Sequence, residues 1–200
     1  MLNPEFNTIT MNHSIKNISL FLCCILFIAC NKEGKYDGDS MINYPDMELI
    51  LKENLESYQK APYTFKLITL ENGKKDSSFL KASEVVWKEL TAPFLKANLY
   101  QKKLDKHYDI NVFTDTLYGK MTMLLTSIDP KAITSKMSIT AKSGSNKIMT
   151  VYAETRDAGF LTTKEYKLLY VVGKTLQIQE ATKYPFMDVK KRIRTLSFLN

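Results

Sequence analysis

The residues best suited to covalent chemistry are the three cysteines, Cys23, Cys24 and Cys30. The first two lie inside an apolar run from Ile18 to Ala29, and Cys30 directly follows that run. A run of about a dozen residues is shorter than the ~20 that a bilayer-spanning helix needs. Its length is typical of the apolar core of a secretory signal, and residues 11–17 before it carry Lys16 and no acid, as the leading region of such a signal does.

The end of the apolar run, Phe27-Ile28-Ala29-Cys30, resembles the bacterial lipobox. In that motif the final cysteine is acylated and becomes the first residue of the mature protein. Phe27 stands where leucine is usual, whereas the small residue before the cysteine fits. The alternative is an ordinary signal peptide with a chance cysteine. We expect residues 1–29 to be a signal peptide, with Met11 as its true start and residues 1–10 as an upstream extension, and Cys30 to be the site of lipid attachment.

Removal of residues 1–29 would leave Cys30 as the single cysteine, and acylation would occupy it. Disulfides within the chain and a cysteine nucleophile are then excluded. Residues 30–43, rich in glycine and in charges of both signs, predict a flexible tether. The net charge of +7 comes from lysines spread along the chain, which favours solubility over contact with an anionic surface. Because export removes the protein from the cytoplasm, we expect no nucleic-acid partner.

Residues for catalysis or metal binding are sparse in the rest of the chain. The single histidine after the signal, His107, follows Lys106 at the start of a predicted strand, outside any Gly-x-Ser-x-Gly context, and we expect it at the surface. The spacings of a calcium loop and of a phosphate-binding glycine loop are absent from the sequence. The spacing of the acidic residues neither supports nor excludes a pair of carboxylates for glycoside hydrolysis. We therefore predict no catalytic residue, no metal ligand and no cofactor.

Two weaker features remain. One is the basic cluster Lys190, Lys191, Arg192 and Arg194. It could bind phosphates on a membrane or a partner, but a solvated edge strand is the favoured interpretation. The other is a set of strand residues, Met121, Met123, Met137, Met149, Tyr152, Tyr166 and Tyr170. A concave sheet lined in this way could hold a hydrophobic ligand, although an ordinary core is favoured.

The first half of the domain predicts a helix, a hairpin and a second helix. Apolar spacing favours a helix over residues 44–60. Strands Tyr63–Leu70 and Lys75–Lys81 flank Asn72-Gly73, a hairpin turn that should pair Leu67 with Ser78 and Phe65 with Leu80. The second helix should be capped by Ser83 and kinked, or broken into two short helices, at Pro93. Its predicted apolar stripe consists of Val86, Trp87, Leu90 and Phe94, with Trp87 as a core anchor.

From Tyr108 onward the apolar residues alternate, which predicts a series of antiparallel strands. Gly173-Lys174 fits a two-residue turn that would pair Leu169 with Ile178 and Val171 with Leu176 on a buried face. The last segment, Lys190–Leu199, should be an edge strand guarded by its basic residues. We expect an α+β fold with an antiparallel β-meander sheet and two helices of the N-terminal half packed on it, as a single domain over residues 44–200.

Short motifs along the predicted domain are similar to those of small lipoproteins of unknown function that are common in Bacteroidota. They are Tyr44-Pro45-Asp46-Met47-Glu48, Glu71-Asn72-Gly73-Lys74-Lys75, Val86-Trp87-Lys88-Glu89-Leu90, Ala97-Asn98-Leu99 and Leu168-Leu169-Tyr170. The resemblance implies a lipid-anchored α+β domain with no assigned catalytic residues. In that group the second helix continues where this chain has Pro93. Some such proteins reach the cell surface through an acidic signal after the acylated cysteine, which only Lys32-Glu33 resembles here.

These features together predict an envelope lipoprotein, anchored through acylated Cys30 and located in the outer membrane facing the periplasm, with surface exposure as the alternative. Its domain is expected to be a non-enzymatic binding or structural module for an envelope protein or a hydrophobic ligand. The alternative function is a carrier or chaperone for lipids or lipoproteins, with an apolar cavity formed by a curved sheet.

Overall fold

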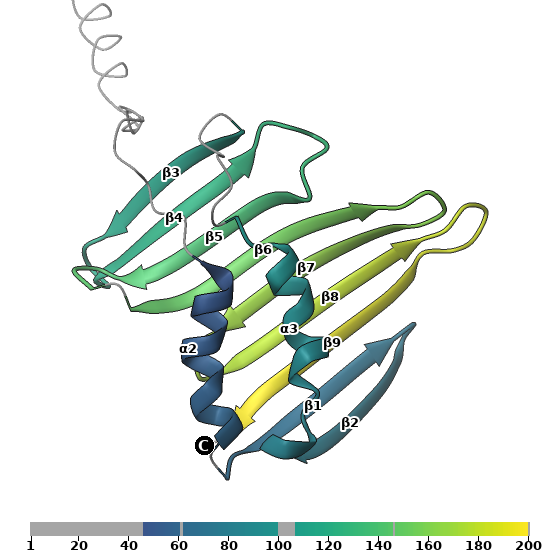
Figure 1. The fold of residues 1–200 in the computed structure, drawn as a ribbon, viewed down its shortest axis with the longest axis horizontal. Helices are drawn as coiled ribbons and strands as arrows, with labels where there is room; N and C mark the ends of the chain where they lie inside the picture. Colours follow the sequence, from purple (N-terminus) through teal and green to yellow (C-terminus); the bar gives the residue numbers. More distant parts are fainter. Residues whose placement is uncertain (1–45, 61, 100–106, 146, 200) are drawn as a thin grey trace, which may run out of the picture. The chain divides into compact units, whose positions relative to one another are not determined.

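A computed structural model describes residues 46–60, 62–99, 107–145 and 147–199, which all belong to one compact unit (Figure 1). Cys30, the signal and the tether lie outside the described residues. The elements are α2 (Met47–Lys60), β1 (Thr64–Glu71), β2 (Lys74–Lys81), the 3-10 turn η1 (Ala82–Glu84), α3 (Trp87–Lys96), β3 (Tyr108–Asp115), β4 (Lys120–Ser127), β5 (Thr134–Lys142), β6 (Ile148–Ala158), β7 (Thr163–Val171), β8 (Thr175–Lys183) and β9 (Lys190–Leu199).

Helix α2 begins at a polar cap that is shared with the end of α3. The Asp46 carboxylate accepts a hydrogen bond from the Glu48 amide at 2.9 Å, and the Asn98 side chain bonds both Asp46 and the Met47 amide. These contacts satisfy amide groups that the first helical turn leaves without partners. The face of α2 with helical spacing is buried against the sheet at Met47, Ile50, Leu51 and Leu55.

The first hairpin has the predicted register. Leu67 pairs with Ser78 and Phe65 with Leu80. The turn residues Asn72 and Gly73 have φ angles of 48° and 84°, the left-handed conformation that asparagine and glycine adopt most readily. The local sequence was sufficient to determine this element.

The second helix differs from its prediction at its start. A 3-10 turn comes first, and the Glu84 carboxylate, rather than Ser83, closes it by accepting from the Lys81 amide at 2.6 Å. The chain then runs extended through Val85 before α3 begins at Trp87. Helix α3 continues past Pro93 to Lys96, so the break falls before the proline and not at it.

The predicted stripe on α3 is correct except at its first position. Leu90 and Phe94 are buried, whereas Val86 lies ahead of the helix and is exposed. Trp87 is confirmed as a core anchor. Its ring meets Phe65 edge-on at 5.3 Å, and its indole N–H donates to the Ala82 carbonyl at 3.1 Å.

The predicted register between β7 and β8 is wrong by one residue. Leu168 pairs with Ile178 and Tyr170 with Leu176, because the turn has three residues, with Gly173 at a φ angle of 68° in its centre. A one-residue shift moves a strand's whole apolar set to the other face of the sheet. Leu168 and Tyr170 are therefore fully buried, whereas Leu169 and Val171 lie on the opposite face.

The prediction of an edge strand at Lys190–Leu199 is also wrong. The strand order is β2-β1-β9-β8-β7-β6-β5-β4-β3, so β9 lies between β8 and β1. Strand β1 pairs with β9 along its whole length, from Thr64 opposite Leu199 to Glu71 opposite Arg192. The N-terminal hairpin is thus added beside the last strand, and the edges of the sheet are β2 and β3.

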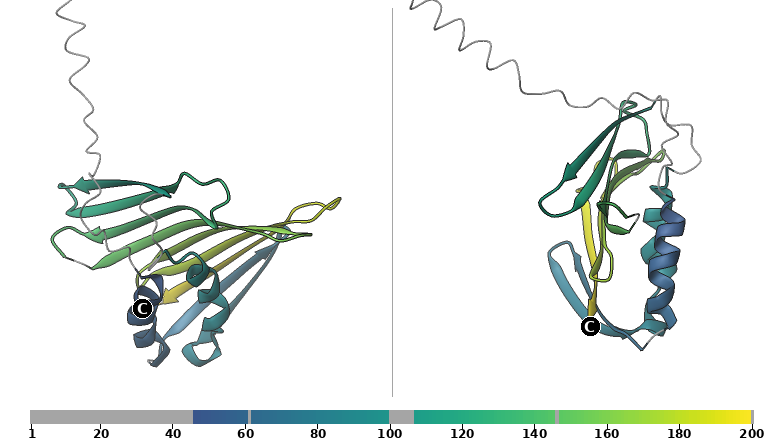
Figure 2. Two further views of the ribbon diagram at one scale, coloured as in Figure 1. Left: turned by 45° about the horizontal axis from the view of Figure 1, so that its top comes forward. Right: turned by 90° about the vertical axis from the view of Figure 1, so that its left-hand side faces the viewer.

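The architecture is a nine-stranded antiparallel sheet with both helices on one face (Figures 1 and 2). It is richer in sheet than a typical α+β domain, and its strand order departs from a simple meander. Side chains of α2, α3 and the facing strands form one core, centred on Phe65, Phe94, Leu168, Tyr170 and Leu196. Within the described part of the chain, every helix is too short or too polar to cross a bilayer.

Candidate ligand-binding cleft

The predicted basic cluster does not form a single patch. Because side chains alternate along a strand, Lys190, Arg192 and Arg194 lie on the face of β9 that carries the helices, and Lys191 lies on the other face. Lys190 is placed over the ring of Tyr184, at 5.5 Å from its centroid. Arg192 and Arg194 have different surroundings and must be considered separately.

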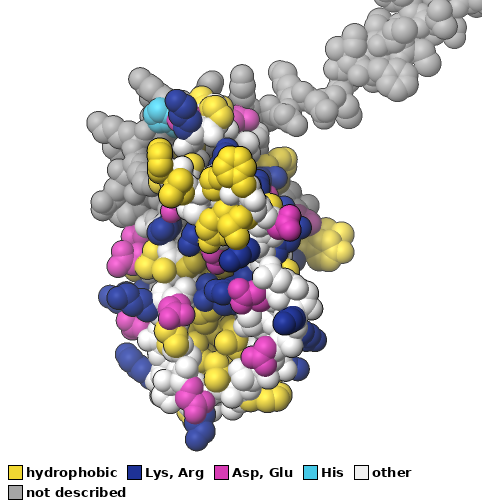
Figure 3. Space-filling model, turned by 90° about the vertical axis from the view of Figure 1, so that its right-hand side faces the viewer, with side chains coloured by type: hydrophobic (Ala, Val, Ile, Leu, Met, Phe, Trp, Pro, Cys, Tyr) yellow, Lys and Arg dark blue, Asp and Glu magenta, His cyan; other side chains and the backbone are white. Residues whose placement is uncertain are grey.

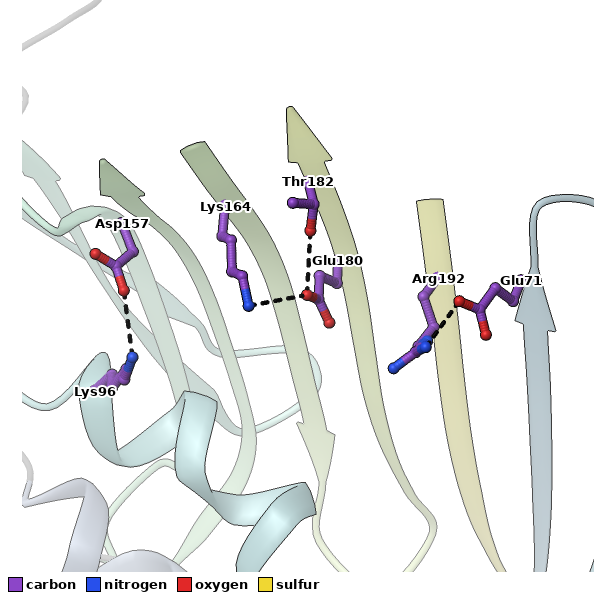
Figure 4. A network of polar contacts seen from close by, with 7 residues as sticks. All are labelled: Glu71, Lys96, Asp157, Lys164, Glu180, Thr182 and Arg192. Carbon is purple, nitrogen blue, oxygen red and sulfur yellow. Dashed lines mark hydrogen bonds and ion pairs between the residues drawn. The ribbon is translucent and has the colours of Figure 1, made fainter. Parts of the chain in front are cut away.

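Arg192 belongs to a row of charges that crosses five strands on the helix-bearing face. From β6 to β1 the row consists of Asp157, Lys164, Glu180, Arg192 and Glu71, with alternating sign (Figure 4). Arg192 Nη2 lies 2.7 Å from Glu71 Oε1, and Lys164 Nζ lies 3.8 Å from Glu180 Oε1. The row marks the boundary where the apolar zone under the helices ends.

The ion pair with Glu71 neutralises Arg192. The hydrogen bond from Arg192, with its positive charge, lowers the pKa of the Glu71 carboxyl below its ordinary value, and the same bond raises the pKa of Arg192. Both side chains are nearly half exposed, so the pair is screened by solvent and contributes little to folding. Arg192 is thus already satisfied in this state of the protein.

Arg194 is more deeply placed and less satisfied. Its side chain is 19% exposed, and its Nε is buried without a hydrogen-bond partner among the described residues. The closest ion-pair partner, Glu89 on α3, lies at 4.0 Å and is itself 70% exposed. Leaving such a donor unpaired costs free energy. Arg194 therefore retains both a positive charge and an unused donor.

Arg194 lines a cleft of about 390 Å³ between β1, β2 and β9 on one side and η1 and the first turn of α3 on the other. One part of its lining is aliphatic, consisting of Leu67, Leu80, Val85, Val86 and Leu90. The other part is polar, consisting of Thr69, Glu71, Ser78, Glu84, Glu89, Arg192 and Arg194. An apolar wall with a few converging polar groups is the usual composition of a small-molecule site, and the volume lies within the usual range of ~300–1,000 Å³.

The arrangement suits a ligand with an anionic head and a short apolar tail. A carboxylate or phosphate oxygen could accept hydrogen bonds from Arg194, for which guanidinium has the matching geometry. The tail would contact the aliphatic wall. Three carboxylates, those of Glu71, Glu84 and Glu89, line the cleft, but no group of three side chains that could hold a metal ion occurs in the described ranges. The geometry supports binding.

The other predicted features lie elsewhere. His107 is exposed at the start of β3, as expected. The methionine and tyrosine set is divided: Met137 and Tyr170 are buried in the core, whereas Met121 and Met149 are each more than a third exposed. Sequence reasoning missed Glu71, Glu89 and Thr69, because the cleft exists only once β1 pairs with β9. The alternating basic residues of β9 could have indicated the cleft, but only if the strands that neighbour β9 had been predicted correctly.

Comparisons of the chain with family models, with curated proteins and with solved structures give no match.

Proposed function

We propose that this protein is an envelope lipoprotein, anchored through acylated Cys30 after removal of residues 1–29, whose domain binds an amphipathic anion without catalysis. Residues 30–43 would tether the domain to the outer membrane on its periplasmic side. The observation that carries the binding proposal is Arg194, a largely buried cation with an unpaired Nε at an aliphatic wall. A ligand oxygen would supply the missing hydrogen-bond partner.

Binding of dodecanoate to the full chain, measured by calorimetry, tests the cleft. The charge-assisted hydrogen bonds of Arg194 should contribute about 1.5–3 kcal/mol, so Arg194→Gln should weaken binding roughly 10- to 150-fold. Dodecanol, which has no charge, should bind weakly and equally to both proteins. Lys183→Gln is the matched control, because Lys183 is an exposed cation outside the cleft that pairs with Glu165. Equal affinity of the parent and Arg194→Gln would show that the cleft is not the site.

Fractionation of cells tests the anchor separately. Cys30→Ser should leave the protein unprocessed or soluble. A Cys30→Ser variant that still fractionates with the membrane as an acylated species of mature size would refute the anchor.

A carrier or chaperone for lipids or lipoproteins is the second candidate. The aliphatic wall of the cleft favours it, because an acyl chain could lie there. The side chains of α2 and α3 that fill the central part of the sheet face argue against a larger cavity in that place. A carrier should extract a fluorescent acyl lipid from vesicles and pass it to acceptor vesicles, whereas a simple binding domain should not.

A further inference from the structure

The hairpin end of the sheet carries a group of exposed hydrophobic side chains. The turn between β6 and β7 presents Phe160 and Leu161, and the turn between β8 and β9 presents Phe186 and Met187. Phe160 and Phe186 are fully exposed. These two turns lie side by side, because Thr163 at the start of β7 pairs with Lys183 at the end of β8. We call Phe160, Leu161, Phe186 and Met187 the tip cluster.

The backbone of Phe186, one residue of the tip cluster, is in an energetically unfavourable conformation. Phe186 has a φ angle of 60°, in the left-handed region that bulky residues rarely adopt. A residue there is normally glycine or asparagine, and Phe186 gains no burial in return. Packing within the described residues therefore does not explain this conformation.

Basic residues lie beside the β8–β9 turn of the tip cluster. The segment from residue 183 to residue 192 contains Lys183, Lys190, Lys191 and Arg192 and a single acid, Asp188. Lys183 pairs with Glu165 and Arg192 with Glu71, so Lys190 and Lys191 supply the positive charge there. Figure 3 faces this end of the sheet, and it shows hydrophobic side chains gathered on it, with lysine and arginine side chains beside them and acidic side chains interspersed. Exposed aromatic and aliphatic side chains with a basic surround are the composition of a surface that enters the headgroup region of an anionic bilayer.

We propose that the tip cluster inserts into an anionic lipid surface, and so gives the domain a second membrane contact beside its anchor. Asp46 lies sixteen positions after Cys30, so an extended tether would span roughly 50 Å, which is more than the length of the strands. The anchor therefore leaves the hairpin end free to face the membrane. This tether argument rests on the proposed anchor, whereas the exposure and charge of the tip cluster do not.

Tryptophans introduced one at a time into the full chain test this contact. Phe160→Trp and Phe186→Trp are each mixed with vesicles of phosphatidylcholine and phosphatidylglycerol that contain a brominated lipid, which quenches tryptophan only within the bilayer. The parent protein supplies the background of Trp87, which is partly buried and packs against the core. Leu117→Trp is the control, because Leu117 is also strongly exposed, at 83%, but lies in the turn between β3 and β4, at the opposite end of the strands.

We expect strong quenching and a blue-shifted emission at positions 160 and 186, and neither at position 117. Replacing Phe160 and Phe186 with aspartate should lower quenching of a third probe, Leu161→Trp, roughly tenfold or more. Quenching of equal strength at positions 117 and 160, or its absence at 160, would overturn the proposal. So would equal quenching in vesicles of phosphatidylcholine alone, or a blue shift that grows with protein concentration without vesicles. Fractionation of Cys30→Ser reports on the anchor separately.

Discussion

Arg194→Met should stabilise the ligand-free domain. The Arg194 Nε is buried without a partner among the described residues, and a buried unpaired donor costs about 1–3 kcal/mol. The interaction that the substitution removes is the contact with Glu89 at 4.0 Å, which is worth at most about 1 kcal/mol because the Glu89 side chain is 70% exposed. Methionine keeps an unbranched apolar stem of similar reach. The expected gain is about 1 kcal/mol in the free energy of unfolding.

Urea unfolding followed by Trp87 fluorescence would measure this gain as a higher midpoint with an unchanged slope. The matched control is Arg192→Met, which removes the 2.7 Å contact with Glu71 and should leave the domain slightly less stable. The same Arg194→Met protein should bind dodecanoate more weakly than the parent, so that stability rises as affinity falls. An Arg194→Met protein that is less stable than the parent by about 1 kcal/mol or more would contradict the reasoning, because it would mean that the guanidinium is held by favourable contacts.

Two further predictions concern the β7–β8 turn and the row of charges. Gly173→Ala and Gly144→Ala should each lower the free energy of unfolding by about 1–2 kcal/mol, because both glycines have a left-handed backbone conformation. The loss should be larger for Gly173→Ala, because the added Cβ would lie 2.7 Å from the Tyr58 hydroxyl. In a Tyr58→Phe background the two losses should become equal. Equal losses in both variants would show that the hydroxyl moves aside freely. By carboxyl NMR, Glu71 should titrate below its ordinary value of 4.5, with its pKa returning toward 4.5 in Arg192→Gln. The pKa of Glu71 is lower in the folded protein than in the unfolded chain. The stability that the pair contributes is therefore present above about pH 4.5 and is lost as the pH falls through the lowered pKa. An unchanged Glu71 pKa in Arg192→Gln would exclude Arg192 as the cause.

The sequence predicted those elements that depend on neighbouring residues. The Asn72-Gly73 turn determines the register of its own hairpin, and helical spacing located the buried face of α2. The register of β7 against β8 was missed because Gly173 can serve either a two-residue or a three-residue turn, and the local sequence does not distinguish the two.

The candidate site was beyond sequence reasoning for a different reason. Its lining comes from residues as distant as Leu67 and Arg194, which meet because β1 pairs with β9. Nothing in the local pattern of either strand indicates its partner. The sequence placed the basic residues of β9 on an edge strand. In the structure, Arg192 instead pairs with Glu71 of β1, and Arg194 faces the more distant Glu89 of α3.

The pairing of the first strand with the last also affects how the chain can fold. Thr64 lies opposite Leu199, so the central part of the sheet cannot be completed until the final ten residues have been synthesised. Contacts between such distant residues make folding slow, because a long loop must close before they form. In a chain of this topology the pairing of β1 with β9 therefore forms late. That delay would suit a protein that crosses a membrane as an extended chain and folds only on the far side.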